Sequence, residues 1–344
     1  MGGDYVPGSV WFYAPNKGAP VAWAIFFAVS CAVHTWQCIH YKAWKFAGLL
    51  PWTALVFTAG YIMREIGAYH FGNINVLISS ICLVYAAPPF YELANYIILG
   101  RILYYVPYHS PIHPGRVLTT FGAISGIVEA LNGNGASYST NSSLSESKQK
   151  MGRDLMKAAL VIQLGIITSF VWLAVYFHRR CYKANLLPDN LKSILYTLYA
   201  SSALIMVRTI YRTVEYFSVA TIRFGPGFDP MSMSPIIRYE WFFWVFEALL
   251  MITNSVLLNF RHPAQYLPSS NKVYLAEDGV TEIMGPGYAD KRNFFITFLD
   301  PFDLIGLIQG KDKKDRYWER REEAIAPAVD DDTIAVHGGR DAKA

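Results

Sequence analysis

The sequence is poor in charge for its length. Only 16% of its 344 residues are charged, whereas about a quarter of the residues of an average soluble domain carry a charge. It contains neither a basic stripe nor a zinc-finger or RNA-binding signature, so we expect no nucleic acid among its partners. Hydrophobic residues make up 53% of the chain and aromatic residues 15%. Because these residues gather in long blocks, the composition predicts an integral membrane protein.

The usual motifs of catalysis are also missing. There is no GxxxxGK[ST] phosphate loop, no GxGxxG after a strand, no HExxH and no GxSxG. The eight histidines are scattered, whereas a membrane hydroxylase or desaturase needs clustered pairs. Cys31, Cys38 and Cys82 lie inside apolar blocks, and no Cys-x-x-Cys pair suggests zinc. We therefore expect no enzymatic activity, no metal and no cofactor.

The apolar blocks predict an all-α polytopic fold with seven transmembrane helices, since a crossing helix needs roughly 17–25 mainly apolar residues. The predicted spans are about 20–41, 46–63, 75–99, 117–135, 155–177, 193–215 and 236–258. The fourth span is short and contains Gly122, Gly126 and Glu129, so a re-entrant segment is the alternative there. Residues 1–19 form an extracellular segment in this interpretation, and residues 261–344 a largely disordered cytoplasmic tail.

The connections between the spans favour one orientation. Basic residues are concentrated in alternate loops, at Lys42, Lys45, Arg101, Arg116, Arg179, Arg180, Lys183, Lys192 and Arg261. The opposing loops also contain basic residues, at Lys148, Lys150, Arg153 and Arg223. Because cytoplasmic loops carry the excess of Lys and Arg, this pattern places the N-terminus outside and the C-terminus in the cytoplasm. The one sequon, at Asn141, then falls outside and predicts a glycosylation site.

Ionisable residues inside the spans are the candidate functional residues, because a charge at the bilayer centre costs about 2.5–3.5 kcal/mol on insertion scales. Arg208, Arg212 and Glu215 are spaced i, i+4 and i+7 and share one helical face. Glu240 and Glu247 are seven apart and also share a face, so the two sets predict an interhelical charge cluster. The other candidates are Arg64, Glu92 and Glu129. Pairing of helices, snorkelling to the interface and a substrate pathway remain alternative roles for these residues.

Four blocks of sequence resemble the fungal lipid-translocating exporter family. They are GYIMREIG (60–67), APPFYELANYIILGRIL (87–103), RTIYRTVEYF (208–217) and YEWFFWVFEALLM (239–251), followed by Arg261-His262-Pro263. The family comprises seven-helix proteins associated with aminocholesterol resistance and with release of sphingoid long-chain bases. The resemblance covers about residues 15–265. Its pattern carries over onto Arg64, Pro88, Tyr96, Arg101, Arg208, Arg212, Glu215 and Glu240.

The chain departs from the family pattern in three spans. Gly122 and Glu129 stand in span four where the family usually has Asp and then Gln, and Glu247 replaces an Asp. Span five keeps Gln163 but has Ala159 where a Gly is usual. These departures from the family pattern predict a diverged substrate, such as a specialised metabolite instead of a sphingoid base.

The resemblance implies a plasma-membrane exporter of amphipathic lipids, such as sphingoid bases, or of lipid-like toxic compounds, which contributes to resistance. In this hypothesis the carboxylates of Glu129, Glu240 and Glu247 accommodate an amine head group, while Arg208 and Arg212 hold them ionised. The alternatives are a seven-helix lipid-sensing receptor and an indirect regulator of membrane lipid asymmetry.

Overall fold

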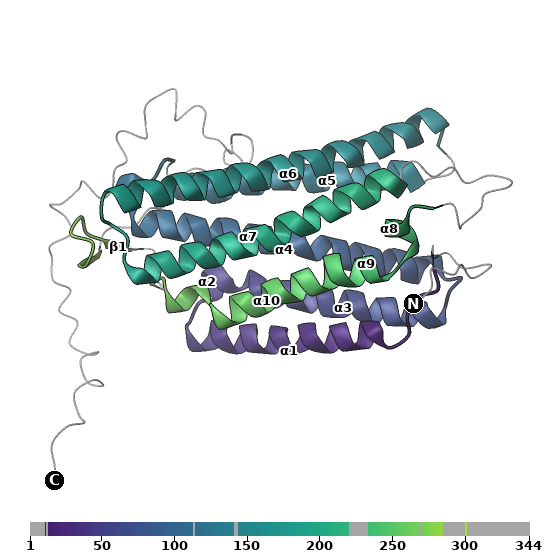
Figure 1. Ribbon diagram of the computed structural model, residues 1–344, viewed down its shortest axis with the longest axis horizontal. Helices are drawn as coiled ribbons and strands as arrows, with labels where there is room; N and C mark the ends of the chain where they lie inside the picture. Colours follow the sequence, from purple (N-terminus) through teal and green to yellow (C-terminus); the bar gives the residue numbers. More distant parts are fainter. Residues whose placement is uncertain are drawn as a thin grey trace, which may run out of the picture.

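The computed structural model describes residues 11, 13–112, 114–140, 144–219, 233–268, 270, 272–284 and 300. Long helices run side by side as an elongated bundle (Figure 1). In chain order the helices are α1 (Ala19–His40), α2 (Trp44–Ala47), α3 (Leu49–Tyr69), α4 (Ile74–Tyr105), α5 (Pro114–Thr140), α6 (Glu146–Lys183), α7 (Asp189–Val219), α8 (Pro235–Arg238), α9 (Trp241–Phe243) and α10 (Leu250–Phe260). A π-helical turn, η3 (Trp244–Leu249), joins α9 to α10, and η1 (Pro107–His109) and η4 (Pro263–Gln265) are short 3₁₀ turns.

The apolar surface of the bundle is that of a membrane protein. Five helical segments are long and apolar enough to cross a membrane: α1, α4, α6, α7 and Trp241–Gln265. Large apolar side chains are exposed along the helices, for example Phe26 (53%), Trp52 (52%) and Trp172 (65%). Soluble monomers rarely expose contiguous apolar surface on this scale. The predicted class of all-α membrane protein therefore fits; α3 and α5 are not among the five segments.

Most helices extend beyond the predicted spans. The third span, predicted at 75–99, continues to Tyr105, and the fifth, predicted at 155–177, covers Glu146–Lys183. Apolarity marks only the part of a helix at membrane depth, whereas backbone hydrogen bonding continues through the polar ends. The predicted 117–135 segment is a continuous 27-residue helix, α5, without the break that a re-entrant segment would need.

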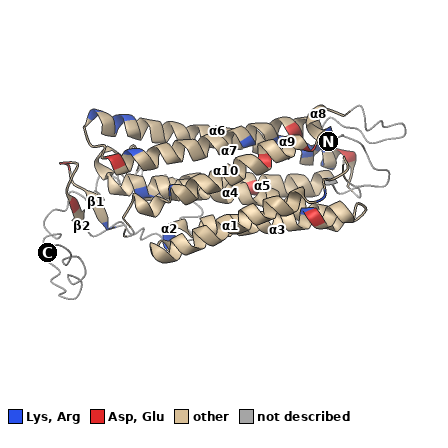
Figure 2. Cartoon of the chain, turned by 60° about the horizontal axis from the view of Figure 1, so that its bottom comes forward, with Lys and Arg blue, Asp and Glu red and all other residues tan. Residues whose placement is uncertain are grey.

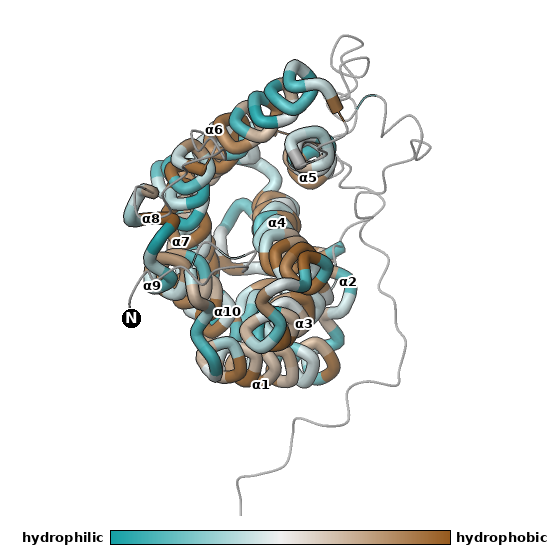
Figure 3. Tube along the Cα trace, turned by 90° about the vertical axis from the view of Figure 1, so that its right-hand side faces the viewer, coloured by the Kyte–Doolittle hydropathy of each residue, from teal (hydrophilic) through white to brown (hydrophobic). Residues whose placement is uncertain are grey.

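Helix α4 lies at the centre of the bundle. Viewed along the helices, α1, α3 and α10 lie on one side of it and α5, α6 and α7 on the other (Figure 3). Two apolar clusters fill these sides. Phe27, Phe57 and Tyr91 belong to the first, and Leu99 and Phe170 to the second. Both clusters include residues of α4, which therefore connects the two halves.

Helices α5 and α6 approach each other closely at a pair of glycines. A Cβ atom on Gly152 would lie 2.7 Å from the carbonyl oxygen of Gly135 and 2.6 Å from the amide nitrogen of Ser139. No side chain fits at that distance, so Gly152 is what lets the backbones touch, as small residues do at membrane helix interfaces.

The residues that follow α10 are folded onto one end of the bundle. Strands β1 (Val273–Leu275) and β2 (Glu282–Met284) form an antiparallel hairpin. Leu275 is buried in the second apolar cluster, and the hydroxyl of Tyr105 donates to Glu282 Oε1 at 2.9 Å. The first part of the segment predicted as a largely disordered tail is therefore ordered. Except for Asp300, the rest of that segment lies outside the described residues, as does Asn141.

Candidate functional site

Charged residues occur at both ends of the bundle and at a few interior positions (Figure 2). The deepest charges form an ion pair between α7 and η3. Arg208 Nε donates to both carboxylate oxygens of Glu247, at 3.0 and 2.9 Å, and Nη2 donates to Oε1 at 2.9 Å. The Arg208 side chain is 5% exposed and that of Glu247 is fully buried. This two-pronged geometry is the strong form of a carboxylate–guanidinium contact, so the predicted pairing of these two spans exists.

The carboxylate of this pair lies on the π-helical turn. Glu247 falls within Trp244–Leu249, where the backbone leaves the α-helical pattern. Single π turns inside α-helices are rare and are often found at functional sites. The wider turn also changes the angular relation between residues before and after it.

Glu240 consequently pairs with a different arginine from the one expected. The sequence placed it on one face with Glu247, opposite Arg208 and Arg212, but its Oε1 accepts from Arg64 Nη2 on α3 at 2.9 Å. The i, i+7 spacing predicts a shared face only in an uninterrupted α-helix, and here Glu240 precedes α9 and is separated from Glu247 by the start of the π turn.

The N-terminal residues that are described close over the Arg64–Glu240 pair. Arg64 Nη2 donates to the hydroxyl of Tyr13 at 2.5 Å, and the amide of Asn16 donates to Glu240 Oε2 at 2.8 Å. The guanidinium lies 4.0 Å from the ring centre of Phe243 and 4.8 Å from that of Trp11. Burial raises the pKa of Tyr13 to about 12, so the phenol remains neutral. Sequence reasoning missed Tyr13 and Asn16, because nothing in an isolated polar segment indicates which helix end it contacts.

Arg212 and Glu215 form a separate pair within α7. Arg212 Nη1 hydrogen-bonds to Glu215 and donates to the Tyr85 hydroxyl of α4 at 2.7 Å. The guanidinium also lies 3.6 Å from the Tyr85 ring centre. Both charges are thus paired without the last helical segment, Trp241–Phe260, and Arg208 is the α7 residue that forms an ion pair with that segment.

Glu92 differs from the other buried carboxylates because its partners are neutral. It lies on α4 and is 4% exposed. Its Oε1 accepts from Gln163 Nε2 of α6 at 2.8 Å, and its Oε2 from the Tyr96 hydroxyl at 3.4 Å. Tyr96 in turn lies 3.2 Å from the Ser125 hydroxyl of α5. Among the described residues no Lys, Arg or His forms an ion pair with Glu92.

Glu129 lies on α5 at a similar depth. At about 1.5 Å per residue, it is about 22 Å from the start of α5, and Glu92 is about 20 Å from the adjoining end of α4. Glu129 is exposed, and within the described part of the chain it has neither a hydrogen bond nor an ion pair. Within the described parts of the predicted membrane spans, the two carboxylates without an ion pair thus lie on the neighbouring helices α4 and α5.

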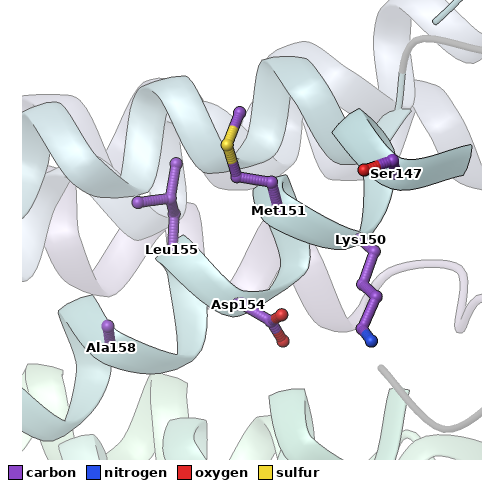
Figure 4. Close-up of a pocket in the computed structure, with 6 residues that line it drawn as sticks. All are labelled: Ser147, Lys150, Met151, Asp154, Leu155 and Ala158. Atoms are coloured by element: carbon purple, nitrogen blue, oxygen red, sulfur yellow. The ribbon is translucent and has the colours of Figure 1, made fainter. Parts of the chain in front are cut away.

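A shallow hollow of about 370 Å³ lies on α6 near its start (Figure 4). Its lining residues are Ser147, Lys150, Met151, Asp154, Leu155 and Ala158. None of the predicted site residues lines it. Among the described residues, no group of three or more His, Cys, Asp or Glu side chains is arranged to hold a metal ion.

The sequence can now be compared with known proteins. A family model described as RTA1 like protein matches residues 52–270, which contain most of α3, all of α4 to α10 and every buried charge described above. The chain belongs to this family. No solved structure matches it significantly.

Curated relatives from fungi agree with this membership. A lipid-translocating exporter-like protein RTA1 of Leptosphaeria maculans is 42% identical over 92% of this chain and 63% of its own length. A protein of the same name from Ajellomyces capsulatus is 29% identical over 79% of this chain and 86% of its own. A probable lipid transporter, atnI, of Emericella nidulans is 22% identical over 76% of this chain and 70% of its own. The chain thus spans less than two thirds of the length of the first of these relatives. The predicted resemblance to lipid-translocating exporters is confirmed.

Proposed function

We propose that this protein exports amphipathic lipids with a cationic amine head group, such as sphingoid bases, or lipid-like toxic compounds, across the plasma membrane, and so contributes to resistance. The names of its relatives support lipid transport in general. The proposal includes no enzymatic step. The acyl chain can stay in the bilayer while the head group passes along the interior of the bundle.

The observation that carries this proposal is the environment of Glu92. An ionised carboxylate at membrane depth needs a cation or a water-filled cavity. Gln163 and Tyr96 orient this carboxylate with neutral hydrogen bonds and supply no positive charge. A lipid ammonium supplies the missing positive charge, and Glu129 on the neighbouring helix offers a second carboxylate at similar depth.

This assignment revises the roles expected for Glu240 and Glu247. Their carboxylates are occupied by Arg64 and Arg208. An amine that bound there would have to displace a buried guanidinium, so we assign to these pairs the structural task of joining the last helix to α3 and α7.

We further propose that the seven long helical segments, α1, α3, α4, α5, α6, α7 and Trp241–Phe260, each cross the bilayer, with the N-terminus outside and the C-terminus in the cytoplasm. The alternation of basic loops supports this orientation. Single cysteines introduced at Lys45 and at Glu146, in a version without the four native cysteines, test it with an impermeant thiol reagent. We expect labelling of intact cells at 146 only; labelling at 45 would reverse the orientation.

Reconstitution tests the transport itself. Liposomes that contain the purified protein are loaded with a labelled long-chain amine, and its appearance in the outer leaflet is measured. We expect faster movement than in protein-free liposomes and a loss of at least tenfold in Glu92→Gln, which keeps the shape of the side chain but removes its charge. The matched control is Glu146→Gln at the exposed start of α6. Equal rates with and without protein would overturn the proposal.

The second candidate function is a lipid-sensing receptor that acts through its tail. The third, an indirect regulator of lipid asymmetry, is excluded if the purified protein moves lipid in liposomes. The hairpin decides where to truncate the tail. Because Leu267 and Leu275 are buried in the core, a truncation near residue 265 would damage the bundle itself. A stop after Met284 removes only what lies beyond the hairpin; a transporter keeps its flux, whereas a receptor loses its response.

Modification of Asn141 is an additional proposal. Its position between α5 and α6 is on the side we assign to the exterior. Treatment with a glycosidase should increase the electrophoretic mobility of the protein from fungal membranes, and Asn141→Gln should abolish that change.

A further inference from the structure

A group of buried polar side chains between α1 and the end of α10 takes no part in the charge pairs. We call it the α1–α10 polar seam, and it consists of the buried Ser30, His34, Gln37, Ser255 and His262 together with the half-buried Asn259. His34, Ser255 and His262 have no exposed surface. Polar side chains are rarely placed between membrane helices without a structural or functional reason.

Only some of these groups satisfy one another. The hydroxyls of Ser30 and Ser255 lie 2.6 Å apart, and Asn259 Nδ2 donates to Ser30 Oγ at 2.5 Å. Gln37 Nε2 donates to the carbonyl oxygen of Asn259 at 2.7 Å. These bonds join the two helices. Four buried atoms remain without a partner: His34 Nδ1, Gln37 Oε1, Asn259 Oδ1 and His262 Nε2.

A hydrogen bond assigns the proton on the His262 ring, and the contact of His34 with Ser255 is compatible with a proton on Nε2 of His34. His262 Nδ1 accepts from the amide of Ala264 at 3.3 Å, so the neutral ring carries its hydrogen on Nε2. His34 Nε2 lies 3.4 Å from Ser255 Oγ, and with its hydrogen there its Nδ1 is a free acceptor. The unpartnered atoms are then three acceptors and one donor. Such a surplus of acceptors suits the binding of one more proton.

The seam reaches the aqueous end of the bundle. The rings of His34 and His262 are 6.4 Å apart, and Tyr41 stacks on His262 with ring centres 5.6 Å apart. Exposed Gln265 donates to the Tyr41 hydroxyl at 3.3 Å. A single aromatic layer therefore separates the histidine pair from water at this end.

The other end of the seam points along α10 toward the interior charges. Asn254 follows Glu247 by seven residues and adjoins Ser255, and neither atom of its buried amide has a partner. At about 1.5 Å per residue, about 10 Å of helix separates Asn254 from Glu247. Hydrogen-bonding groups thus extend from the aqueous end to within two turns of the Arg208–Glu247 pair.

The ionisable neighbours of the two rings are few. α1 contributes Cys38, one turn after His34, and Tyr41; α4 contributes the Tyr91 hydroxyl, which lies close to Ser255. Between Leu49 and Ile62, α3 contains Tyr61 as its one ionisable side chain. Among the described residues no Asp, Glu, Lys or Arg side chain hydrogen-bonds to either ring. Because no carboxylate would balance a permanent charge, a proton here is held only transiently.

We propose that His34 and His262 bind a proton that the transport cycle exchanges for the lipid ammonium, an inference that rests on the proposed function. A proton from the exterior water adds to the free His34 Nδ1, converts the imidazole to an imidazolium, and leaves to the cytoplasmic water past Tyr41 and Gln265. One N–H bond forms and later breaks, and no other bond changes. Exchange of one proton for one ammonium moves no net charge, so a proton gradient drives lipid export.

Reconstituted liposomes that contain a labelled long-chain amine and a lumenal pH dye test this proposal. The variants are His34→Gln and His262→Gln, with His70→Gln, a histidine at the exposed end of α3, as the matched control. In the wild type and the control, a gradient of about one pH unit should change the rate of amine movement about tenfold, and an imposed amine gradient should change the lumenal pH. Both variants should lose both responses, whereas the exchange of labelled for unlabelled amine at equal concentrations on the two sides, which needs no proton, should stay within about twofold of the wild type.

The outcomes separate this inference from the proposed function. Amine movement in the wild type that ignores the pH gradient, or that follows a sodium gradient instead, overturns the proton site but not the exporter. Variants that keep the full pH response overturn the assignment to the two histidines. A wild type that moves no amine overturns both. His262 lies just after the end of α10, and the amide oxygen introduced by His262→Gln can still accept from the Ala264 amide. This variant therefore tests the proposal if His34→Gln does not fold.

Discussion

Three buried glutamates have very different partners in this bundle. On the side of the last helix, Glu247 is bound through both oxygens by Arg208, and Glu240 is bound by Arg64. On the α4–α6 side, Glu92 is almost equally buried but has only Gln163 and Tyr96 as partners. The first region pairs its carboxylates with guanidinium groups, and the second holds a carboxyl group that has no ion pair.

The difference separates structural charges from an available one. Breaking a buried ion pair leaves an uncompensated charge and lowers the stability of the protein. Neither partner of such a pair is therefore available to bind a ligand. A carboxylate that is oriented by neutral donors keeps its capacity to attract a cation. A protein retains a site that lowers its stability when the site has a function. Glu92 fits this description better than the residues of the Arg208–Glu247 and Arg64–Glu240 pairs.

The largest expected effect on the free energy of unfolding comes from breaking the Arg208–Glu247 pair. Arg208→Met should lower the free energy of unfolding by about 3–5 kcal/mol, because Glu247 would remain buried and ionised without a partner. Denaturant titration in detergent micelles, followed by tryptophan fluorescence, measures the change. The double variant Arg208→Met/Glu247→Leu should recover most of the loss. If the single variant were as stable as the wild type, the pair would not hold α7 to the last helix.

The next effect comes from giving Glu92 the cation that it lacks. Gln163→Lys places an ammonium beside this carboxylate, so that Glu92 has a cationic partner as Glu240 and Glu247 do. The flux of a long-chain amine should fall at least tenfold, equivalent to about 1.4 kcal/mol, while thermal stability stays equal or rises. Flux in reconstituted liposomes and the melting temperature in detergent check the two parts.

A neutral control distinguishes charge from shape at this position. Gln163→Met removes the hydrogen bond to Glu92 without supplying a cation, so it should reduce flux much less than the lysine variant. Equal reductions in the two variants would mean that Gln163 acts through packing, and that Glu92 does not bind the amine.

Much of this arrangement could be predicted from sequence. Apolar length identified the regions of the long helices, and charges at membrane depth identified Arg208, Glu247 and Glu92. The pairing partners were harder. A spacing of seven placed Glu240 and Glu247 on one face, but spacing alone does not indicate a π turn between them. The partner of Glu240 therefore had to come from the structure.

The residues outside the membrane helices were the least predictable. Trp11, Tyr13 and Asn16 precede α1, and the hairpin residues Leu275 and Glu282 follow α10. Neither segment has a helical period, so its contacts depend on where the bundle ends rather than on its own pattern. Gly67 gives one local signal in retrospect: a Cβ atom there would lie 2.9 Å from the Trp11 ring.

The N-terminal contact provides a smaller test of the paired region. Arg64→Lys keeps the positive charge but removes the planar guanidinium group. This group contacts the rings of Trp11 and Phe243. It also donates hydrogen bonds to Tyr13 and Glu240. We expect a loss of about 1–2 kcal/mol in the free energy of unfolding, clearly less than in Arg208→Met. Faster proteolysis near residue 11 in the lysine variant would show that the segment has been released; unchanged protection would indicate that the charge alone retains it.

The smallest effect should come from Glu129, which shares the depth of Glu92 but not its burial. Because it is exposed and unpaired in the described structure, Glu129→Gln should change the free energy of unfolding by less than about 0.5 kcal/mol. Its effect on amine flux should be no more than about twofold, against at least tenfold for Glu92→Gln, since a carboxylate held by Gln163 and Tyr96 is preorganised and an unbound one is not. Liposome flux of the two variants measured side by side decides this. A larger loss in Glu129→Gln would place the amine on α5, and the neutral hydrogen bonds of Glu92 would then serve only to pack α4 against α6.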